Sequence, residues 1–427
     1  MIKVTFTIVL LLCLRQTAAT FLDFLPMSVL RERSRSNPRS LNGYLPLPDF
    51  LSLVRRHGYP AEEYEVLTDD GYKLKAHRIP GSPTQPKAPG KPVVYIQHGI
   101  LASSDMFVIG GPEKDLAFLL ADAGYDVWLG NGRGNTYSRS HVRLSPETPI
   151  FWEFSFEEIA LRDVSKTIDF ILYETKQKSV IYVAHSMGTT VGLILLSSKP
   201  EYNQKIRLVV NLAPIGYWKK PRNLMRYFMF NGQYVRALLI ALGMSEVLPQ
   251  MLITARVTNS SCRDGTLLQA ICKTITHFIS GNNADLLDVV RYVLFCSSLY
   301  DLLTDGLAYF PAGVSTRTLS HFYQNIVAGK LQKYDKGYIQ NLLHYGQPSP
   351  PEYNLKNIDV PVYLIYGKAD AVAPPEDSFD LVTRLNNAHV ESVPHDNFTH
   401  LDFVWGRNIK TLLHDRVMEI IESARYA

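Results

Sequence analysis

Short apolar runs alternate with stretches of helical periodicity over two parts of the chain. The runs are continuous, as in strands buried on both faces of a sheet, and the segments between them place apolar residues at helical spacing. The expected strands cover 93–97, 125–129, 180–184, 206–212, 362–366 and 390–393, and the expected helices cover 113–123, 156–174 and 187–198. Strands that alternate with helices predict an α/β fold with a mostly parallel sheet.

Ordered structure is expected to begin near Leu47, ahead of a short helical stretch at 50–57. Residues 64–67 and 72–74 then flank an Asp-Gly turn, which predicts a β-hairpin before the first parallel strand.

The alternation of strands and helices stops between residues 216 and 345. This stretch is mainly helical in pattern and carries apolar clusters such as Tyr227–Phe230 (YFMF). The strand pattern resumes at 362–366, so we interpret 216–345 as an insertion between two strands of one sheet. The core is then expected to comprise residues 47–215 and 346–427. Apolar clusters in the insertion either pack its own core or face an apolar partner.

The first 19 residues have the pattern of a signal peptide. Lys3 precedes an apolar run from Val4 to Leu14, and Thr17-Ala18-Ala19 are small residues suited to cleavage. The apolar run is too short for a membrane-spanning helix, and we expect no transmembrane segment in the mature chain. Residues 20–46 hold arginines among Ser, Asn and Pro and are expected to form a leader segment.

Composition and charge exclude some classes of function. Hydrophobic residues make up 46% of the chain and charged residues 20%, as in ordinary globular proteins. The formal net charge of +4 is small, and no basic stripe with interleaved aromatics favours nucleic-acid binding. No Cys/His cluster predicts a metal, and no cofactor is expected.

Four cysteines and two tripeptides agree with a secretory route. Cys13 lies in the signal segment, Cys262 and Cys272 are close enough for a local disulfide, and Cys296 is left over. Asn259 and Asn397 each begin an N-x-[ST] tripeptide and are glycosylation candidates.

Ser186 stands where an expected strand passes directly into an expected helix, in the stretch VIYVAHSMGTT (180–190). Such a turn lifts a serine Oγ clear of the sheet and places the next N–H at a helix N-terminus. The stretch fits the nucleophile motif G-x-S-x-G except that Ala184 replaces the first glycine. The alternative is a small residue in a tight connection.

A nucleophilic serine needs a base, and the base needs an acid that orients it. Asp370 follows the strand at 362–366, and His400 follows the one at 390–393. Both lie at the carboxyl ends of expected strands, where open α/β sheets bind their ligands. The alternatives are a capping aspartate and a loop histidine. Other residues that could supply the acid or the base are Glu376, Asp377, His395 and Asp396.

The loop His98–Leu101 (HGIL) follows the strand at 93–97 and offers a partner for the oxyanion. We assign the two donors to the backbone N–H groups of Ile100 and Met187. His98 is expected to fix the loop rather than react, and His185 is expected to point away from the Ser186 Oγ.

Seven stretches along the chain carry a resemblance to a known family. They are 69–79 (DDGYKLKAHRI), 97–103 (QHGILAS), 130–138 (GNGRGNTYS), 151–159 (FWEFSFEEI), 184–189 (AHSMGT), 366–371 (YGKADA) and 398–405 (FTHLDFVW). Together they make the chain from about residue 47 to 420 resemble the acid lipases, the gastric and lysosomal acid lipase group of α/β-hydrolases.

The resemblance implies hydrolysis of lipid carboxylic esters, with Ser186, Asp370 and His400 as the triad. It also implies that 216–345 is a cap with a mobile lid and that Cys262–Cys272 is its disulfide. The chain departs from the family pattern at two places, the turn that carries Ser186 and the lid. Ala184 and Met187 replace Gly and Gln of the usual G-H-S-Q-G, and the segment 283–312 is unlike the family pattern.

The leading hypothesis is a serine lipase that acts on triacylglycerol or steryl ester at a lipid–water interface. We expect a secreted protein, with the lysosome as the alternative. The competing hypotheses are a non-catalytic lipid carrier on the same fold and a carboxylesterase for more soluble esters.

Overall fold

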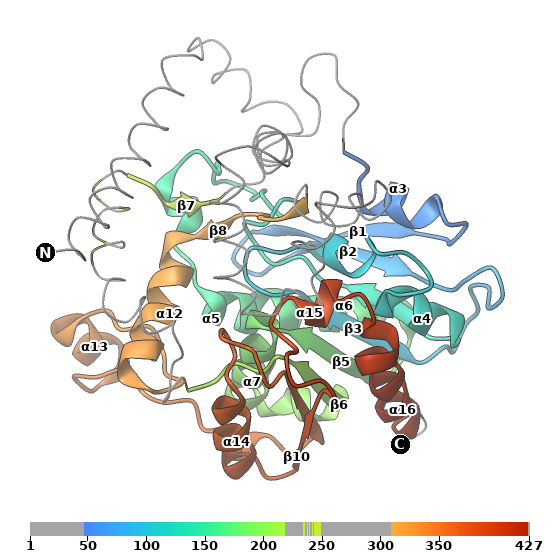
Figure 1. Cartoon of the computed structure of the whole chain (residues 1–427). Helices are drawn as coiled ribbons and strands as arrows, with labels where there is room; N and C mark the ends of the chain where they lie inside the picture. Colours follow the sequence, from blue (N-terminus) through green and yellow to red (C-terminus); the bar gives the residue numbers. More distant parts are fainter. Residues whose placement is uncertain are drawn as a thin grey trace, which may run out of the picture. The chain divides into compact units, whose positions relative to one another are not determined.

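A mostly parallel sheet runs through the structure, a computed structural model that describes residues 47–217, scattered positions between 234 and 248, and residues 309–425. In this part of the chain the main sheet has eight strands in the order β1-β2-β4-β3-β5-β6-β9-β10 (Figure 1). The strands are β1 (Glu62–Leu67), β2 (Lys73–Ile79), β3 (Val93–Gln97), β4 (Asp126–Leu129), β5 (Val180–His185), β6 (Ile206–Leu212), β9 (Val362–Tyr366) and β10 (Ala388–Ser392).

The antiparallel pairs of this sheet are β1–β2 and β2–β4, and the remaining neighbours are parallel. Every residue of β3, β4 and β5 is buried, whereas β1 at the edge alternates between exposed and covered positions. A strand covered on both faces needs apolar residues on both sides, which explains the continuous apolar runs in the sequence. The predicted α/β fold is therefore confirmed.

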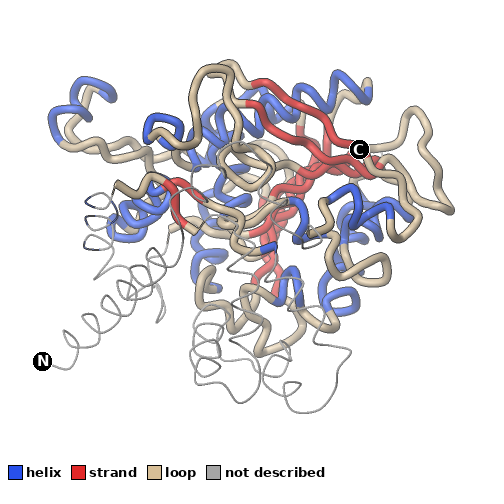
Figure 2. The backbone as a smooth tube through the Cα atoms, turned by 90° about the horizontal axis from the view of Figure 1, so that it is seen from above, coloured by secondary structure: helices blue, strands red, loops and turns tan. Residues whose placement is uncertain are grey.

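Helices lie on both sides of the strands when the molecule is viewed from above (Figure 2). The helices of the core and its flanks are α3 (Phe50–Arg55), α4 (Leu116–Asp122), α5 (Phe156–Glu158), α6 (Ser165–Thr175), α7 (Met187–Ser198), α14 (Pro375–Arg384), α15 (Asp402–Trp405) and α16 (Asp415–Ser423). Short 3₁₀ turns cover Ser104–Phe107, Pro149–Trp152, Pro200–Gln204 and Leu355–Asn357. In α7 every residue from Met187 to Ser197 is buried, as expected for a helix that is apolar on all sides.

The segment expected as one helix at 156–174 is interrupted. It begins as α5, passes through a π-helical turn at Ile159–Val164 and continues as α6. A second π-helical turn, Lys410–His414, precedes α16. The first turn carries Asp163, whose buried carboxylate accepts hydrogen bonds from Arg133. Periodicity alone reveals neither the turn nor this contact.

Strands β6 and β9 are neighbours in the sheet although 216–345 lies between them in the sequence. The described parts of that stretch include β7 (Glu246–Val247), which pairs with β8 (Val314–Ser315), and the helices α12 (Thr316–Ala328) and α13 (Tyr338–Tyr345). The expected signal peptide and leader, Asn259, Cys262 and Cys272 lie outside the described residues. The division into core and cap therefore stays a prediction.

Candidate active site

Three side chains from three loops form one hydrogen-bonded relay. The Ser186 Oγ is 2.8 Å from Nε2 of His400, and Nδ1 of His400 is 2.8 Å from Oδ2 of Asp370. Ser186 follows β5, Asp370 follows β9 and His400 follows β10, so parallel pairing brings all three to the carboxyl edge of the sheet. All three side chains are buried.

The Asp370 carboxylate is held by its own loop. Its Oδ1 accepts backbone hydrogen bonds from Val372 at 2.8 Å and from Ala373 at 2.7 Å. Oδ2 is left for the Nδ1–H of His400, and a histidine that donates from Nδ1 has Nε2 free to accept from the Ser186 hydroxyl. The arrangement fixes both the orientation and the tautomer of the ring.

Ser186 has a strained backbone, with φ 54° and ψ −122°. This conformation is unusual for a residue with a side chain and persists only where the surroundings enforce it. The Ser186 N–H donates to the oxygen of Leu212 in β6, and the Ser186 oxygen accepts from Thr189 one turn into α7. The strain turns the chain sharply from β5 into α7, which is the geometry of a nucleophile elbow.

Gly188 is required by the close crossing of α7 and the end of β3. A Cβ at this position would lie 2.7 Å from the oxygen of Gln97 and 2.9 Å from that of His98. Ala184, which replaces the first glycine of the motif, is the penultimate residue of β5 and is fully buried between Gln97 of β3 and Asn211 of β6.

The two assigned oxyanion donors belong to the residue after Ser186 and to the loop after β3. Met187 is the first residue of α7, where backbone N–H groups lack partners within the helix. Ile100 belongs to the loop after β3, which passes Ser186 so closely that a Cβ on Gly99 would be 3.0 Å from the Ser186 Cβ. Leu101 in the same loop adopts a left-handed conformation with φ 59°.

His98 ties this loop to the segment after β4. Its Nδ1 is 2.7 Å from the Gly99 oxygen, and its Nε2 accepts from the Gly132 N–H at 3.1 Å. A ring that donates from Nδ1 and accepts at Nε2 is neutral. Burial lowers the pKa of His98 to about 4, which favours the same neutral state.

The segment after β4 also holds two asparagines that support the site and that the sequence alone did not identify as site residues. The amide of Asn135 lies 3.3 Å from Nε2 of His98 and donates to Oδ1 of Asn131 at 2.9 Å. Both asparagines come from the stretch GNGRGNTYS directly after β4. A polar, glycine-rich stretch at the carboxyl end of a strand is the signal that could have identified them.

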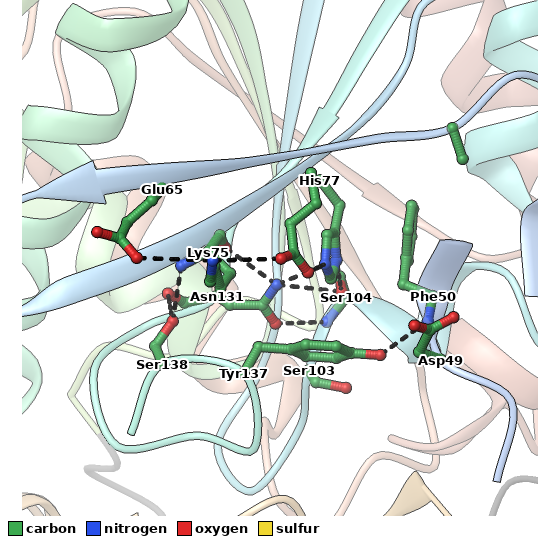
Figure 3. A network of polar contacts seen from close by, with 12 residues as sticks. Asp49, Phe50, Glu65, Lys75, His77, Ser103, Ser104, Asn131, Tyr137 and Ser138 are labelled. Atoms are coloured by element: carbon green, nitrogen blue, oxygen red, sulfur yellow. Dashed lines mark hydrogen bonds and ion pairs between the residues drawn. The ribbon is translucent and has the colours of Figure 1, made fainter. Parts of the chain in front are cut away.

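Asn131 also reaches the β1–β2 side of the sheet, where Figure 3 shows it beside Ser104 and His77. It accepts from the Ser104 N–H at 3.0 Å, and Nδ1 of His77 is 2.7 Å from the Ser104 Oγ. Nε2 of His77 lies 3.1 Å from Glu63, and this contact lowers the pKa of the Glu63 carboxyl to about 2. The polar chain thus runs from the β1–β2 hairpin to the loop beside Ser186.

The other residues considered as the acid or the base of the triad make contacts outside the relay. Asp396 is exposed and pairs with Lys368 at 2.7 Å, and His395 Nδ1 accepts from the Asn397 N–H. Asp377 is buried and accepts from the Gly216 N–H, while Glu376 lies beside it in the first turn of α14. The residue that contacts His400 Nδ1 is Asp370.

Comparisons with known proteins agree with this geometry. Residues 50–111 match the family model described as a partial alpha/beta-hydrolase lipase region, and residues 92–240 match the alpha/beta hydrolase fold. Mouse gastric triacylglycerol lipase is 37% identical, over 86% of this chain and 90% of the relative. Human lipase member K is 36% identical, over 87% of this chain and 90% of the relative. Lipase 3 of Drosophila melanogaster is 37% identical, over 90% of this chain and 95% of the relative.

The chain belongs to the acid lipase family of α/β-hydrolases. Its membership makes it an ester-hydrolysing enzyme, as the resemblance implied. Among solved structures, the protein lip1 of Acinetobacter baumannii AYE aligns with a TM-score of 0.50 at 14% identity, over 90% of this chain and 98% of that one. DcsB in complex with its substrate analogue also aligns with a TM-score of 0.50 at 14% identity, over 86% and 100%. At this identity the two structures support the fold alone.

Two further findings concern the part of this acid lipase family member that the structure describes. No described helix is both long and apolar enough to cross a membrane. Within the same residues, no group of three or more His, Cys, Asp or Glu could hold a metal ion. Asn397 is exposed three residues before His400.

Proposed function

We propose that this acid lipase family member is a serine lipase that hydrolyses carboxylic esters of neutral lipids through an acyl-enzyme on Ser186. The observation that carries the proposal is the relay of 2.8 Å contacts from the Ser186 Oγ through His400 to Asp370. A buried serine, histidine and aspartate in this order and geometry are the parts that acyl transfer requires.

In the acylation step, the Ser186 Oγ attacks the ester carbonyl carbon while Nε2 of His400 takes the hydroxyl proton. The carbonyl oxygen becomes an oxyanion, and the imidazolium is stabilised by the Asp370 carboxylate at Nδ1. Collapse of the tetrahedral intermediate breaks the bond to the alkoxy oxygen. His400 returns its proton to that oxygen, so the alcohol leaves neutral and the acyl group stays on Ser186.

Deacylation repeats these steps with water in place of the serine as the nucleophile. His400 takes a proton from a water molecule, whose oxygen attacks the acyl carbon, and the second tetrahedral intermediate expels the Ser186 Oγ. The proton on His400 passes back to the serine, and the fatty acid is released. Because Asp370 is held by two backbone N–H groups, the imidazole keeps its orientation through both halves of the reaction.

The oxyanion of both intermediates would be bound by the backbone N–H groups of Ile100 and Met187. Met187 supplies a donor at the start of α7, where the helix dipole also favours negative charge. Donors of this kind act through the backbone, which explains how methionine can stand where the family elbow has glutamine. Removing one such donor in other serine hydrolases costs about 10²–10³ in kcat.

The substrate class follows from the family. Two of the relatives named above are a gastric triacylglycerol lipase and a lipase K, and we extend lipid ester hydrolysis to this chain with triacylglycerol or steryl ester as the substrate. Residues 216–345 would form the cap over the site, with apolar clusters such as YFMF available for acyl chains. Such a substrate would be met at a lipid–water interface.

The secretory route is part of the same proposal. The signal-like segment 1–19 and the N-x-[ST] sites at Asn259 and Asn397 support export, as does the disulfide implied for Cys262 and Cys272. Secretion is the leading destination, and the lysosome is the alternative. The exposed Asn397 side chain leaves room for a glycan to project into solvent.

A panel of esters tests the substrate class. Purified full-length protein would be given triacylglycerols of several chain lengths, cholesteryl oleate and p-nitrophenyl butyrate, each above and below its solubility limit, with Ser186→Ala as the control. We expect hydrolysis of the emulsified neutral lipids that Ser186→Ala abolishes. Turnover restricted to dissolved esters would instead indicate a carboxylesterase, and lipid binding without turnover would indicate a carrier.

A further inference from the structure

Helix α13 presents an apolar face to solvent. Tyr338, Ile339, Leu342 and Leu343 are 67%, 70%, 41% and 77% exposed. They occupy positions i, i+1, i+4 and i+5 of the helix, so they lie on one continuous side. In Figure 1 this helix lies at the outer edge of the described part, beyond α12.

The side of α13 that carries Asn341 is fixed to the protein. Asn341 is 1% exposed; its Nδ2 donates to Asp335 at 2.7 Å and to the Pro348 oxygen at 3.0 Å, and its Oδ1 accepts from the Lys336 N–H. Gln324 of α12 holds the backbone of Asp335 through two hydrogen bonds. These hydrogen bonds hold the helix so that Asn341 is buried and the four apolar side chains are exposed.

An apolar face held outward in this way marks an interaction surface, because soluble proteins rarely expose large contiguous apolar patches. The adjoining chain is basic. Residues 330–346 contain three lysines, Lys330, Lys333 and Lys336, and one acidic residue, Asp335, whose carboxylate is engaged by Asn341 and Gly337. The nearest carboxylates to two of these lysines are at the outer limit of ion pairing, 3.9 Å for Lys330 to Glu352 and 4.0 Å for Lys333 to Glu157.

We propose that α13 and its lysine-bearing approach, residues 330–345, form a docking surface for an anionic lipid layer. The apolar side chains enter the acyl region, and the lysines lie near negatively charged headgroups. The inference rests on the proposed function, because an enzyme of neutral lipids has to reside at a lipid surface while it works. It concerns where the protein docks and is independent of how the ester is cleaved.

Vesicle binding tests this surface. Full-length protein carrying Ser186→Ala, which removes any change of the lipid by hydrolysis, would be sedimented with vesicles of phosphatidylcholine alone or mixed with phosphatidylserine. We expect stronger binding to the anionic vesicles, weakened by salt. Ile339→Ser with Leu343→Ser should weaken binding about tenfold or more, since two inserted side chains are lost. Replacing the three lysines with Gln should remove the preference for phosphatidylserine.

The matched control is Ile150→Ser with Leu67→Ser, two exposed apolar residues outside α13. This pair should leave vesicle binding unchanged. In the background with Ser186 intact, the α13 pair should keep normal turnover of dissolved p-nitrophenyl butyrate, because neither side chain touches the relay. Loss of vesicle binding with intact turnover separates this inference from the proposed function.

Three outcomes would overturn the proposal. One is an α13 variant that binds vesicles as the parent does. Another is a parent protein that binds neither kind of vesicle. The third is a parent that self-associates through this face, seen as a dimer in light scattering that the α13 pair dissociates while vesicle binding is unaffected; the face would then be a protein interface.

Discussion

Nε2 of His185 lies 3.2 Å from the main-chain oxygen of His400, the histidine of the relay. The two rings are 4.9 Å apart, and Nδ1 of His185 is buried without a hydrogen-bond partner in the described structure. Burial, followed by the charge of His400, holds the pKa of His185 well below its ordinary value. A neutral His185 therefore donates from Nε2 and positions the backbone that carries His400.

Replacing His185 with leucine should remove this support. We expect kcat on a soluble ester to fall about tenfold to a hundredfold with little change in KM, because a small displacement of His400 misaligns the relay. His185→Gln keeps an N–H donor of similar reach and should recover most of the loss. Steady-state kinetics of both variants provide the measurement. Equal kcat for the His185→Leu and His185→Gln variants would show that the hydrogen bond to His400 is unimportant.

Gly188→Ala should disturb the elbow. The added methyl would meet the oxygens of Gln97 and His98 at less than 3 Å, both of them backbone atoms that move only with β3 and its loop. We expect a loss of about 1–3 kcal/mol in the free energy of unfolding, together with a lower kcat. Urea denaturation and ester hydrolysis measure the two effects. Ser198→Ala at the exposed end of α7 is the control and should change neither.

Arg133 joins three distant segments. It donates to Asp70 and Asp163 and lies over the ring of Tyr72 at 4.0 Å. Arg133→Met would leave the buried Asp163 carboxylate without its cation, and we expect a loss of about 3–5 kcal/mol in the free energy of unfolding.

The matched control for this variant is Arg416→Met, which breaks an exposed pair with Glu391 and should cost less than about 1 kcal/mol. Adding Asp163→Asn to Arg133→Met should recover part of the stability, because the unpaired charge is removed. A loss in Arg133→Met no larger than in Arg416→Met would contradict the role assigned to this network.

His98 should make stability depend on pH. Its folded pKa of about 4 lies below the unfolded value of 6.5, so the unfolded chain binds more protons between these values. The stability contributed by neutral His98 is therefore complete above pH 6.5 and is lost as the pH falls toward 4, by up to about 3 kcal/mol.

A His98→Gln variant cannot titrate at this position. The difference in unfolding free energy between parent and variant should be constant above pH 6.5 and should shift against the parent as the pH is lowered to 4. Urea unfolding of both proteins at pH 7.5, 5.5 and 4 measures it. A difference that stays constant over the whole range would contradict the neutral, buried state of His98.

The sequence predicted the buried strands of the sheet well because the signals there are local. Apolar runs set the bounds of β6 and β9, and small residues with a strand–helix junction set the start of α7. The positions of Asp370 and His400 followed because carboxyl ends of parallel strands share one edge. Neither inference needed knowledge of distant contacts.

The hydrogen bonds that support the site could not be predicted, because they join segments that are distant in the sequence. His77 and Ser104 come from separate segments, as do His98 and Asn135, and their pairing depends on three-dimensional placement. Periodicity also misleads at α13, where an apolar stripe usually faces the core. There the buried residue is Asn341, because Asp335 and the Pro348 oxygen supply partners that a local pattern does not contain.

Covalent labelling of Ser186 tests the central claim most directly. Purified protein would be treated with a long-chain fluorophosphonate, digested and mapped by mass spectrometry, with Ser186→Ala and His400→Ala in parallel. We expect one adduct, on the peptide that contains Ser186, formed in step with the loss of esterase activity, absent in Ser186→Ala and strongly slowed in His400→Ala. An active protein whose Ser186 stays unlabelled, or a Ser186→Ala variant that keeps the parent's ester hydrolysis, would contradict it.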